Sequence, residues 1–292
     1  RVLKWLALAL LAYPATALMV ADSWPQILRA TFLPEIRLDA GFLFLITGVF
    51  GTSISPYMFF WQASQEVEEE RAIGLAPGEQ GAAAGDALLA GFIRDMRIDT
   101  SIGMVAAELV QWFIIITTGT VLFGHGTHGI NTAADAARAL EPLVRALPLG
   151  GLDAGQVARD VFAIGIIGLG LLAIPVLAGS AAYALSEAFG WTAGLSRRFR
   201  EARGFYGVII LSTLIGLLLN FTGIDPMKAL VFTAVFNGIA AVPLLFLLGR
   251  INGNAAILGA YRGGGLSRAM VWLTFGVMGL AAAGLLVTLV TG

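Results

Sequence analysis

The chain has 292 residues, of which 58% are hydrophobic and only 13% are charged. An average soluble domain carries about 25% charged residues, so one soluble core could not enclose this much apolar surface. The 18 Lys and Arg residues against 19 Asp and Glu residues leave no basic excess for binding nucleic acid. Cysteine is absent, which excludes disulfide scaffolds, thiolate metal sites and cysteine nucleophiles. The composition therefore predicts a polytopic membrane protein.

Seven apolar runs along the chain are candidates for membrane-spanning helices. A helix that crosses a bilayer core of about 30 Å needs roughly 20 apolar residues. The runs lie at residues 6–20, 41–61, 104–123, 161–185, 205–221, 229–248 and 271–290. We expect an all-α fold with a single transmembrane domain over residues 1–292.

The Lys and Arg residues indicate how these helices are oriented. Most of them fall in alternate connections, and the densest cluster follows the fourth run, at Arg197, Arg198, Arg200 and Arg203. Basic residues concentrate on the cytoplasmic side of a membrane. We therefore expect the chain to enter the first run from the cytoplasm and to end outside, as a multi-pass protein of a bacterial-type cell membrane.

The second run contains a polar stretch at membrane depth, GTSISPY at residues 51–57. Pro56 removes one backbone donor and disfavours helical geometry at Ser55. A helix broken here would expose the carbonyl of Thr52 and the hydroxyl of Ser55, as at the substrate sites of secondary transporters. The alternative is a kinked helix whose hydroxyls bond back to their own carbonyls, and the local pattern by itself favours that alternative.

The longer string of residues 51–70, GTSISPYMFFWQASQEVEEE, resembles the sixth transmembrane helix of the Nramp family of divalent-metal transporters and its related branches. The similarity continues through Asp99 and Thr100 and through the string LLAIPVLAGSAAYALSEAFGW to nearly the whole chain. It implies a LeuT-like inverted-repeat fold in which the seven runs are helices 5 to 11, and the orientation agrees with this. The chain then looks N-terminally incomplete, and the missing N-terminal helices of the same protein would be its partners.

The resemblance also implies a site for the transported ion. Aligned on Pro56, Ser55 stands where the family has methionine and Tyr57 where it has histidine, while Thr52 stands where a backbone carbonyl binds metal. Gln62 stands where some relatives carry a second histidine, and the resemblance implies that it lines the inner part of the ion pathway. Two polar residues of the sixth run, Thr233 and Asn237, stand where relatives use a polar residue near the ion, with interhelical hydrogen bonding as the alternative.

These exchanges predict a change in ion preference. Thioethers favour transition ions such as Mn²⁺ and Fe²⁺, whereas hydroxyl and carbonyl oxygens suit harder ions. With Ser55 in place of methionine, we expect a site of the Mn and Fe type that also tolerates Mg²⁺. The family's histidine, which Tyr57 replaces, titrates near neutrality. Its loss removes one group that could couple transport to protons, so whether protons are a second partner besides the metal ion stays open. The divalent ion is the substrate, and no cofactor is expected.

Two functions other than transport are open to a polytopic membrane protein. An intramembrane hydrolase needs a nucleophile with a base or paired aspartates at depth, and both histidines, His125 and His128, lie in one loop. We therefore expect no enzyme. The alternative function is a non-transporting fragment or structural membrane protein that keeps the fold. The acidic run Glu66–Glu70 is interpreted as a solvated helix end rather than a cation-attracting cluster.

Overall fold

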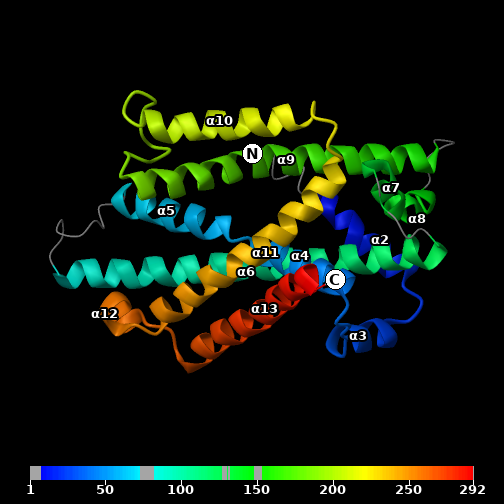
Figure 1. Ribbon diagram of the computed structural model, residues 1–292, viewed down its shortest axis with the longest axis horizontal. Helices are drawn as coiled ribbons and strands as arrows, with labels where there is room; N and C mark the ends of the chain where they lie inside the picture. The colour runs from blue at the N-terminus through cyan, green and yellow to red at the C-terminus, as the bar shows by residue number, and fades with distance from the viewer. Residues whose placement is uncertain (1–7, 73–81, 127–129, 131, 148–152, 292) are drawn as a thin grey trace. The chain divides into compact units, whose positions relative to one another are not determined.

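A computed structural model describes residues 8–72, 82–126, 130, 132–147 and 153–291 (Figure 1). In this part of the chain all regular secondary structure is helical. The α-helices are α2 (Ala12–Val20), α3 (Trp24–Phe32), α4 (Ala40–Ile54), α5 (Tyr57–Ala72), α6 (Ala82–Val121), α7 (Ala133–Ala137), α8 (Glu141–Arg145), α9 (Ala154–Phe189), α10 (Arg203–Leu219), α11 (Pro226–Asn252), α12 (Ala255–Leu258) and α13 (Gly265–Thr291). Short 3-10 turns stand at Leu8–Leu11, Phe123–His125, Arg138–Leu140 and Gly259–Tyr261.

Five helical segments in the described residues are long and apolar enough to cross a membrane. They are Ala40–Ala72, Ala90–Val121, Ala154–Phe189, Pro226–Asn252 and Gly265–Val290. The prediction of an all-α polytopic membrane protein is confirmed. Helix α10 is apolar but shorter, and residues 6 and 7 of the first predicted run lie outside the described residues. That residues 6–20 and 205–221 also cross the bilayer stays a prediction.

The observed helices extend beyond several of the predicted runs. Helix α6 begins at Ala82 rather than near residue 104, and α9 covers Ala154–Phe189 rather than residues 161–185. Hydropathy marks only the apolar part of a helix, whereas charged residues such as Arg94 and Asp95 continue the same helix toward water.

Aspartate side chains fix where three of the long helices begin. The carboxylate of Asp39 accepts a hydrogen bond from the amide of Phe42, at 2.9 Å, at the start of α4. Asp153 caps α9 and Asp225 caps α11 in the same way. Each carboxylate satisfies an amide that has no partner inside its helix, so these starts are encoded locally.

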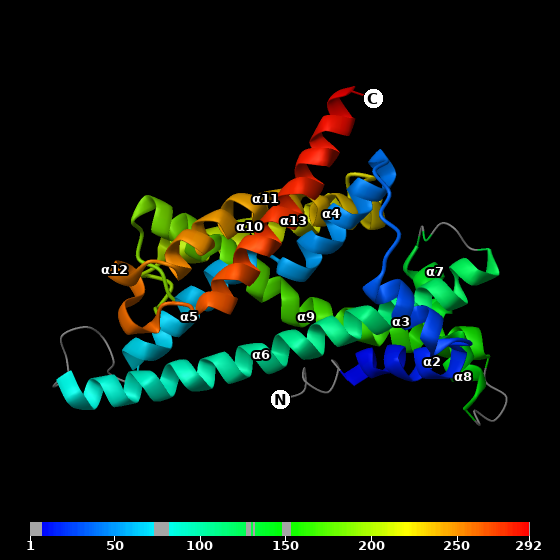
Figure 2. The same ribbon diagram turned by 90° about the horizontal axis from the view of Figure 1, so that it is seen from below.

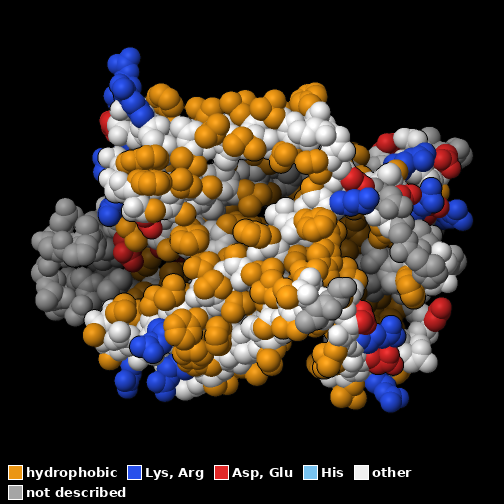
Figure 3. Space-filling view, in the orientation of Figure 1, with side chains coloured by type: hydrophobic (Ala, Val, Ile, Leu, Met, Phe, Trp, Pro, Cys, Tyr) orange, Lys and Arg blue, Asp and Glu red, His pale blue; other side chains and the backbone are white. Residues whose placement is uncertain are grey.

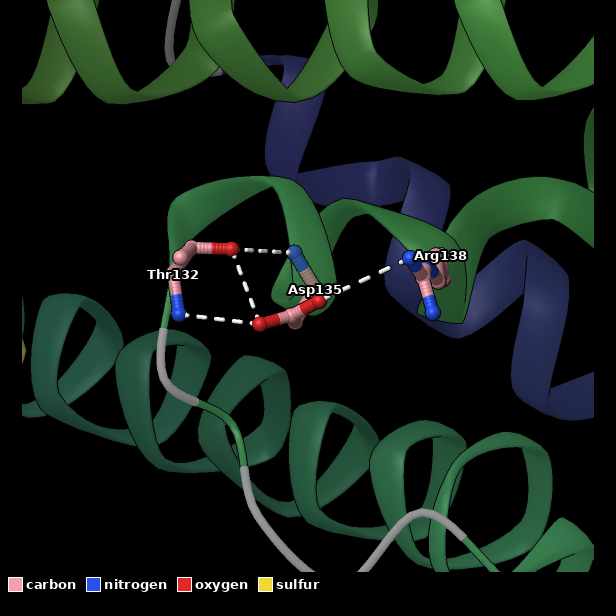
Figure 4. A network of polar contacts seen from close by, with 3 residues as sticks. All are labelled: Thr132, Asp135 and Arg138. Atoms are coloured by element: carbon pink, nitrogen blue, oxygen red, sulfur yellow. Dashed lines mark hydrogen bonds and ion pairs between the residues drawn. The ribbon is translucent and has the colours of Figure 1, made fainter.

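The short helix α7 has a reciprocal cap that Figure 4 shows from close by. The hydroxyl of Thr132 accepts from the amide of Asp135 at 3.1 Å, and the carboxylate of Asp135 accepts from the amide of Thr132 at 3.0 Å. Arg138 lies 3.7 Å from the same carboxylate. This capping box stabilises a helix that is too short to be stable by itself.

The chain forms two compact units, and the first comprises Arg1–Pro34 and Trp61–Thr213. Its core contains the buried side chains of Tyr13, Leu140, Val144 and Ala158. Helix α2 packs along α6 (Figure 2), where the buried hydroxyl of Thr117 donates to the carbonyl of Tyr13 at 3.0 Å. A second core in this unit contains Ala182, Tyr183, Ala202 and Phe205.

The second unit comprises Glu35–Phe60 and Leu214–Gly292, and α4, α11 and α13 pack together in it. Glycines bring α4 and α11 into backbone contact: a Cβ built on Gly51 would lie 2.0 Å from the carbonyl oxygen of Ala234 and 2.4 Å from the amide nitrogen of Gly238. Small residues permit such close approach between membrane helices, where packing rather than the hydrophobic effect drives association. The last turn of α4 is thereby held against the middle of α11.

Large apolar side chains remain exposed on the helices that are long enough to span a membrane. Phe232 of α11 is 66% exposed and Leu280 of α13 is 77% exposed. Figure 3 shows hydrophobic side chains over α10, α11 and α13 on the face toward the viewer. In water such surfaces would be costly, so they are typical of helices surrounded by lipid.

Candidate functional site

The helix of the second predicted run is interrupted at Ser55 and Pro56. Helix α4 ends at Ile54 and α5 begins at Tyr57. Ser55 has φ 44° and ψ 74°, and it is the one non-glycine residue with positive φ in the described part of the chain. Left-handed geometry costs an L-residue roughly 1–2 kcal/mol, so surrounding contacts must hold it in place.

Backbone hydrogen bonding changes at this interruption. Pro56 has no amide hydrogen for the carbonyl of Thr52, and the hydroxyl of Ser55 donates to that carbonyl instead, at 2.6 Å. The amide of Met58 bonds to the carbonyl of Ser55 at 2.8 Å, one residue short of the helical partner. The carbonyl of Ile54 thereby loses its usual amide donor.

The hydroxyls at the interruption bond locally, as the kinked-helix alternative predicts. The hydroxyl of Thr52 donates to the carbonyl of Val49 at 2.8 Å, and that of Ser55 to Thr52. The helix is nevertheless broken rather than merely bent, because Ser55 leaves helical geometry altogether. This bond also brings two oxygens next to each other, the hydroxyl oxygen of Ser55 and the carbonyl oxygen of Thr52.

Helix α11 contributes the next two candidates. Thr233 is exposed, and its hydroxyl donates to the carbonyl of Ala229 at 2.8 Å. Asn237 lies one turn further on, half-buried, immediately before the glycine that contacts α4. Among the described residues, no hydrogen-bond partner is found for the amide of Asn237. The interhelical hydrogen bond that was its alternative interpretation is therefore not seen.

The two candidates on α5 fall in different units. Tyr57 is the first residue of α5, half-buried, and lies in the second unit with Thr52, Ser55, Thr233 and Asn237. Gln62 lies in the first unit, where its amide donates to the hydroxyl of Thr100 at 2.9 Å and toward Glu66 at 3.4 Å. A hydrogen bond to α6 thus engages the side chain of Gln62 within the first unit.

The available ligands at the interruption are uncharged oxygens. Within the described residues, no group of three or more His, Cys, Asp or Glu side chains could hold a metal ion. His128 lies outside these residues. A cation bound at the interruption would meet hydroxyl, carbonyl and amide oxygens, which suit hard divalent ions.

One buried group near the interruption was missed by the sequence analysis. Thr47 of α4 is 2% exposed, and its hydroxyl has no hydrogen-bond partner among the described residues. It lies one turn before Gly51, with its backbone against Gly238. Only its spacing of four from Gly51 marks it in the sequence, and this signal is too common to single out a residue.

The long apolar helices define a multi-pass membrane protein, and one of its apolar helical segments is interrupted at Ser55 and Pro56. A family model described as natural resistance-associated macrophage protein-like (Nramp) matches residues 1–288. The chain belongs to the Nramp family, as its resemblance implied.

One relative is the divalent metal cation transporter MntH of Ralstonia nicotianae (strain ATCC BAA-1114 / GMI1000). It is 24% identical to this chain over 281 residues, which are 93% of this chain. The chain covers 56% of that protein, little more than half of its length. Family and helices together place the chain in the bacterial cell membrane as a multi-pass protein.

Proposed function

We propose that the protein containing this chain is a secondary transporter of divalent metal cations, not an enzyme, and that it binds its substrate at the interruption between α4 and α5. The single observation that carries the proposal is the left-handed Ser55 before Pro56 in a member of the Nramp family. A broken helix at membrane depth provides backbone oxygens without opening the rest of the fold.

The oxygens at the interruption support cation binding. The hydroxyl oxygen of Ser55 and the carbonyl oxygen of Thr52 are 2.6 Å apart. Two neighbouring oxygens in an octahedral shell around Mg²⁺, each about 2.1 Å from the ion, would be separated by about 3.0 Å. A small rotation of the Ser55 hydroxyl, which turns its proton away from the carbonyl, would let both oxygens face one ion. Asn237, whose amide has no hydrogen-bond partner within the described part of the chain, would add a further oxygen from α11.

The ion preference follows from the same oxygens. Because Ser55 offers a hydroxyl where the family has a thioether, we infer a site that accepts Mn²⁺ and Fe²⁺ and discriminates weakly against Mg²⁺. Tyr57 stands where the family has histidine, so coupling to protons through a histidine would need another residue. A LeuT-like arrangement of the helices is part of this proposal.

The test is uptake of Mn²⁺ by the full-length protein in proteoliposomes. Ser55→Ala removes one proposed ligand and should lower uptake about tenfold, the factor that corresponds to one lost ligand interaction of about 1.4 kcal/mol. The matched control is Ser212→Ala, because Ser212 also donates to a backbone carbonyl three residues earlier, at 3.1 Å, but within an unbroken helix. Ser55→Met should restore discrimination, so that excess Mg²⁺ competes with Mn²⁺ in the parent protein and not in this variant.

Two results would contradict the proposal. Uptake in Ser55→Ala equal to that in Ser212→Ala would remove Ser55 from the site. Absence of uptake by the full-length parent, correctly folded in the membrane, would favour the alternative of a non-transporting membrane protein.

A further inference from the structure

Helix α5 presents an aromatic and polar stripe to α9 within the first unit. Trp61 packs so closely on α9 that a Cβ built on Gly179 would lie 2.4 Å from its ring. The ring of Trp61 also meets that of Tyr183 edge to face, at 6.1 Å and 74°. One turn further, Gln65 donates to the hydroxyl of Tyr183 at 2.8 Å. Positions 61, 65 and 68 lie on one face of a helix, so the next contact falls on Glu68.

The carboxylate of Glu68 collects three hydrogen bonds at the end of this stripe. It accepts from the hydroxyl of Tyr183, from the amide of Leu195 at 3.0 Å and from the amide of Ser196 at 3.2 Å. Hydrogen bonds to an ionised acceptor are about twice as strong as neutral ones. The interpretation of Glu66–Glu70 as a solvated helix end is therefore wrong for Glu68. We call Glu68, Tyr183 and the amides of Leu195 and Ser196 the Glu68 clasp.

The connection between α9 and α10 is shaped to receive this carboxylate. Gly194 has φ 141°, and a Cβ there would lie 3.0 Å from the carboxylate oxygen of Glu68. On the other side of the connection, the hydroxyl of Tyr206 in α10 donates to the carbonyl of Arg197 at 2.8 Å. A continuous set of polar contacts thus joins α5, α9, the connection and α10, at the end that the arginine cluster predicts to be cytoplasmic.

We propose that the Glu68 clasp is a gating contact, which holds α5 closed against α9 in this conformation and must open when α5 moves. Its acceptor lies on α5 and its donors lie on α9 and the following connection, more than 110 residues away. The contact can therefore form and break without unfolding either helix. The role in transport rests on the proposed function, whereas closure of α5 on α9 does not depend on it.

The test measures how often this end opens, with a cysteine reporter in the full-length protein. These 292 residues contain no cysteine, so an introduced thiol is the one thiol in this part of the protein, and any cysteine elsewhere in the full-length protein is first replaced by serine. The reporter is Ser186→Cys, because Ser186 is fully buried one turn beyond Tyr183. Its hydroxyl has no hydrogen-bond partner among the described residues, so the exchange for cysteine loses no hydrogen bond. The rate of labelling by a water-soluble maleimide reports the open population.

The expected result is faster labelling in two clasp variants. Glu68→Gln removes the charge and Tyr183→Phe removes one donor, and each should raise the labelling rate about tenfold, as expected for loss of a charge-assisted hydrogen bond. Glu69→Gln is the matched control, because it makes the same change at an exposed neighbour. A second reporter, Ala158→Cys in the other core of this unit, should label no faster in any variant.

Four outcomes are informative. Unchanged labelling of the Ser186→Cys reporter in both clasp variants would overturn the proposal. Equal acceleration at both reporters would also overturn it, because the clasp would then merely stabilise the unit. Acceleration at Ser186→Cys alone supports it, and Mn²⁺ uptake in Glu68→Gln should then fall severalfold. If the parent takes up no Mn²⁺ while labelling responds as expected, the proposed function fails and the clasp stands.

Discussion

The glycine contact between α4 and α11 gives the sharpest prediction, which is that Gly51→Ala destabilises the second unit. The added Cβ would lie 2.0 Å from the carbonyl oxygen of Ala234 and 2.4 Å from the amide nitrogen of Gly238, both backbone atoms that cannot rotate away. Ordinary contact begins near 3.4 Å, so the two helices must separate by about 1 Å or more.

The magnitude follows from two opposing effects. Overpacking a tight contact typically lowers the free energy of unfolding by about 1–3 kcal/mol. The upper end applies here, because the added Cβ would overlap backbone atoms of both Ala234 and Gly238. Alanine in place of glycine inside a helix gains up to about 1 kcal/mol. The net loss is about 2 kcal/mol, which should lower Tm by about 3 °C for cooperative unfolding of the 292 residues.

The assay is thermal unfolding of the detergent-solubilised full-length protein, followed by tryptophan fluorescence. Gly276→Ala is the matched control: Gly276 lies inside α13, and a Cβ there meets nothing within 4 Å. This variant should equal or slightly exceed the parent in Tm. A Gly51→Ala protein as stable as Gly276→Ala would refute the reasoning that backbone contact holds α4 on α11.

Three further predictions concern other contacts. Pro56→Ala restores an amide donor for the carbonyl of Thr52, so we expect a more regular helix. Mn²⁺ uptake should fall about tenfold, which corresponds to about 1.4 kcal/mol. The control is Pro243→Ala, which lies inside the unbroken α11 and should retain uptake. Thr117→Val removes the buried hydrogen bond to the carbonyl of Tyr13 and should lower the free energy of unfolding by about 1–2 kcal/mol. The control is Thr118→Val, which should lower it by less, because the hydroxyl of Thr118 bonds within its own helix at 2.7 Å. Equal losses in the two variants would contradict a role for the bond between α2 and α6. Gly194→Ala should lower the free energy of unfolding by roughly 1–3 kcal/mol, because Gly194 has a φ of 141° and an added Cβ would contact Glu68. The control is Gly264→Ala, where a Cβ meets nothing within 4 Å. Thermal unfolding followed by circular dichroism compares the two variants, and equal Tm values would contradict the prediction.

The sequence by itself determined the membrane class, the family and the position of the helix break. Hydropathy acts over about 20 consecutive residues, and the effect of Pro56 on Ser55 is a matter of adjacent backbone sterics, so both are local. The helix starts at Asp39, Asp153 and Asp225 are local for the same reason.

Only the tertiary structure decided which residues act on one another. Glu68 looked like a solvated residue because its partner Tyr183 is 115 positions away. Gly51 looked like one of many helix glycines until α11 was placed against it, and the bond from Gln62 to Thr100 joins residues 38 positions apart. Hydropathy marks which side chains leave water but not which neighbour they meet, because many helix pairings bury similar apolar area, whereas a hydrogen bond such as that from Tyr183 to Glu68 depends on one particular pairing.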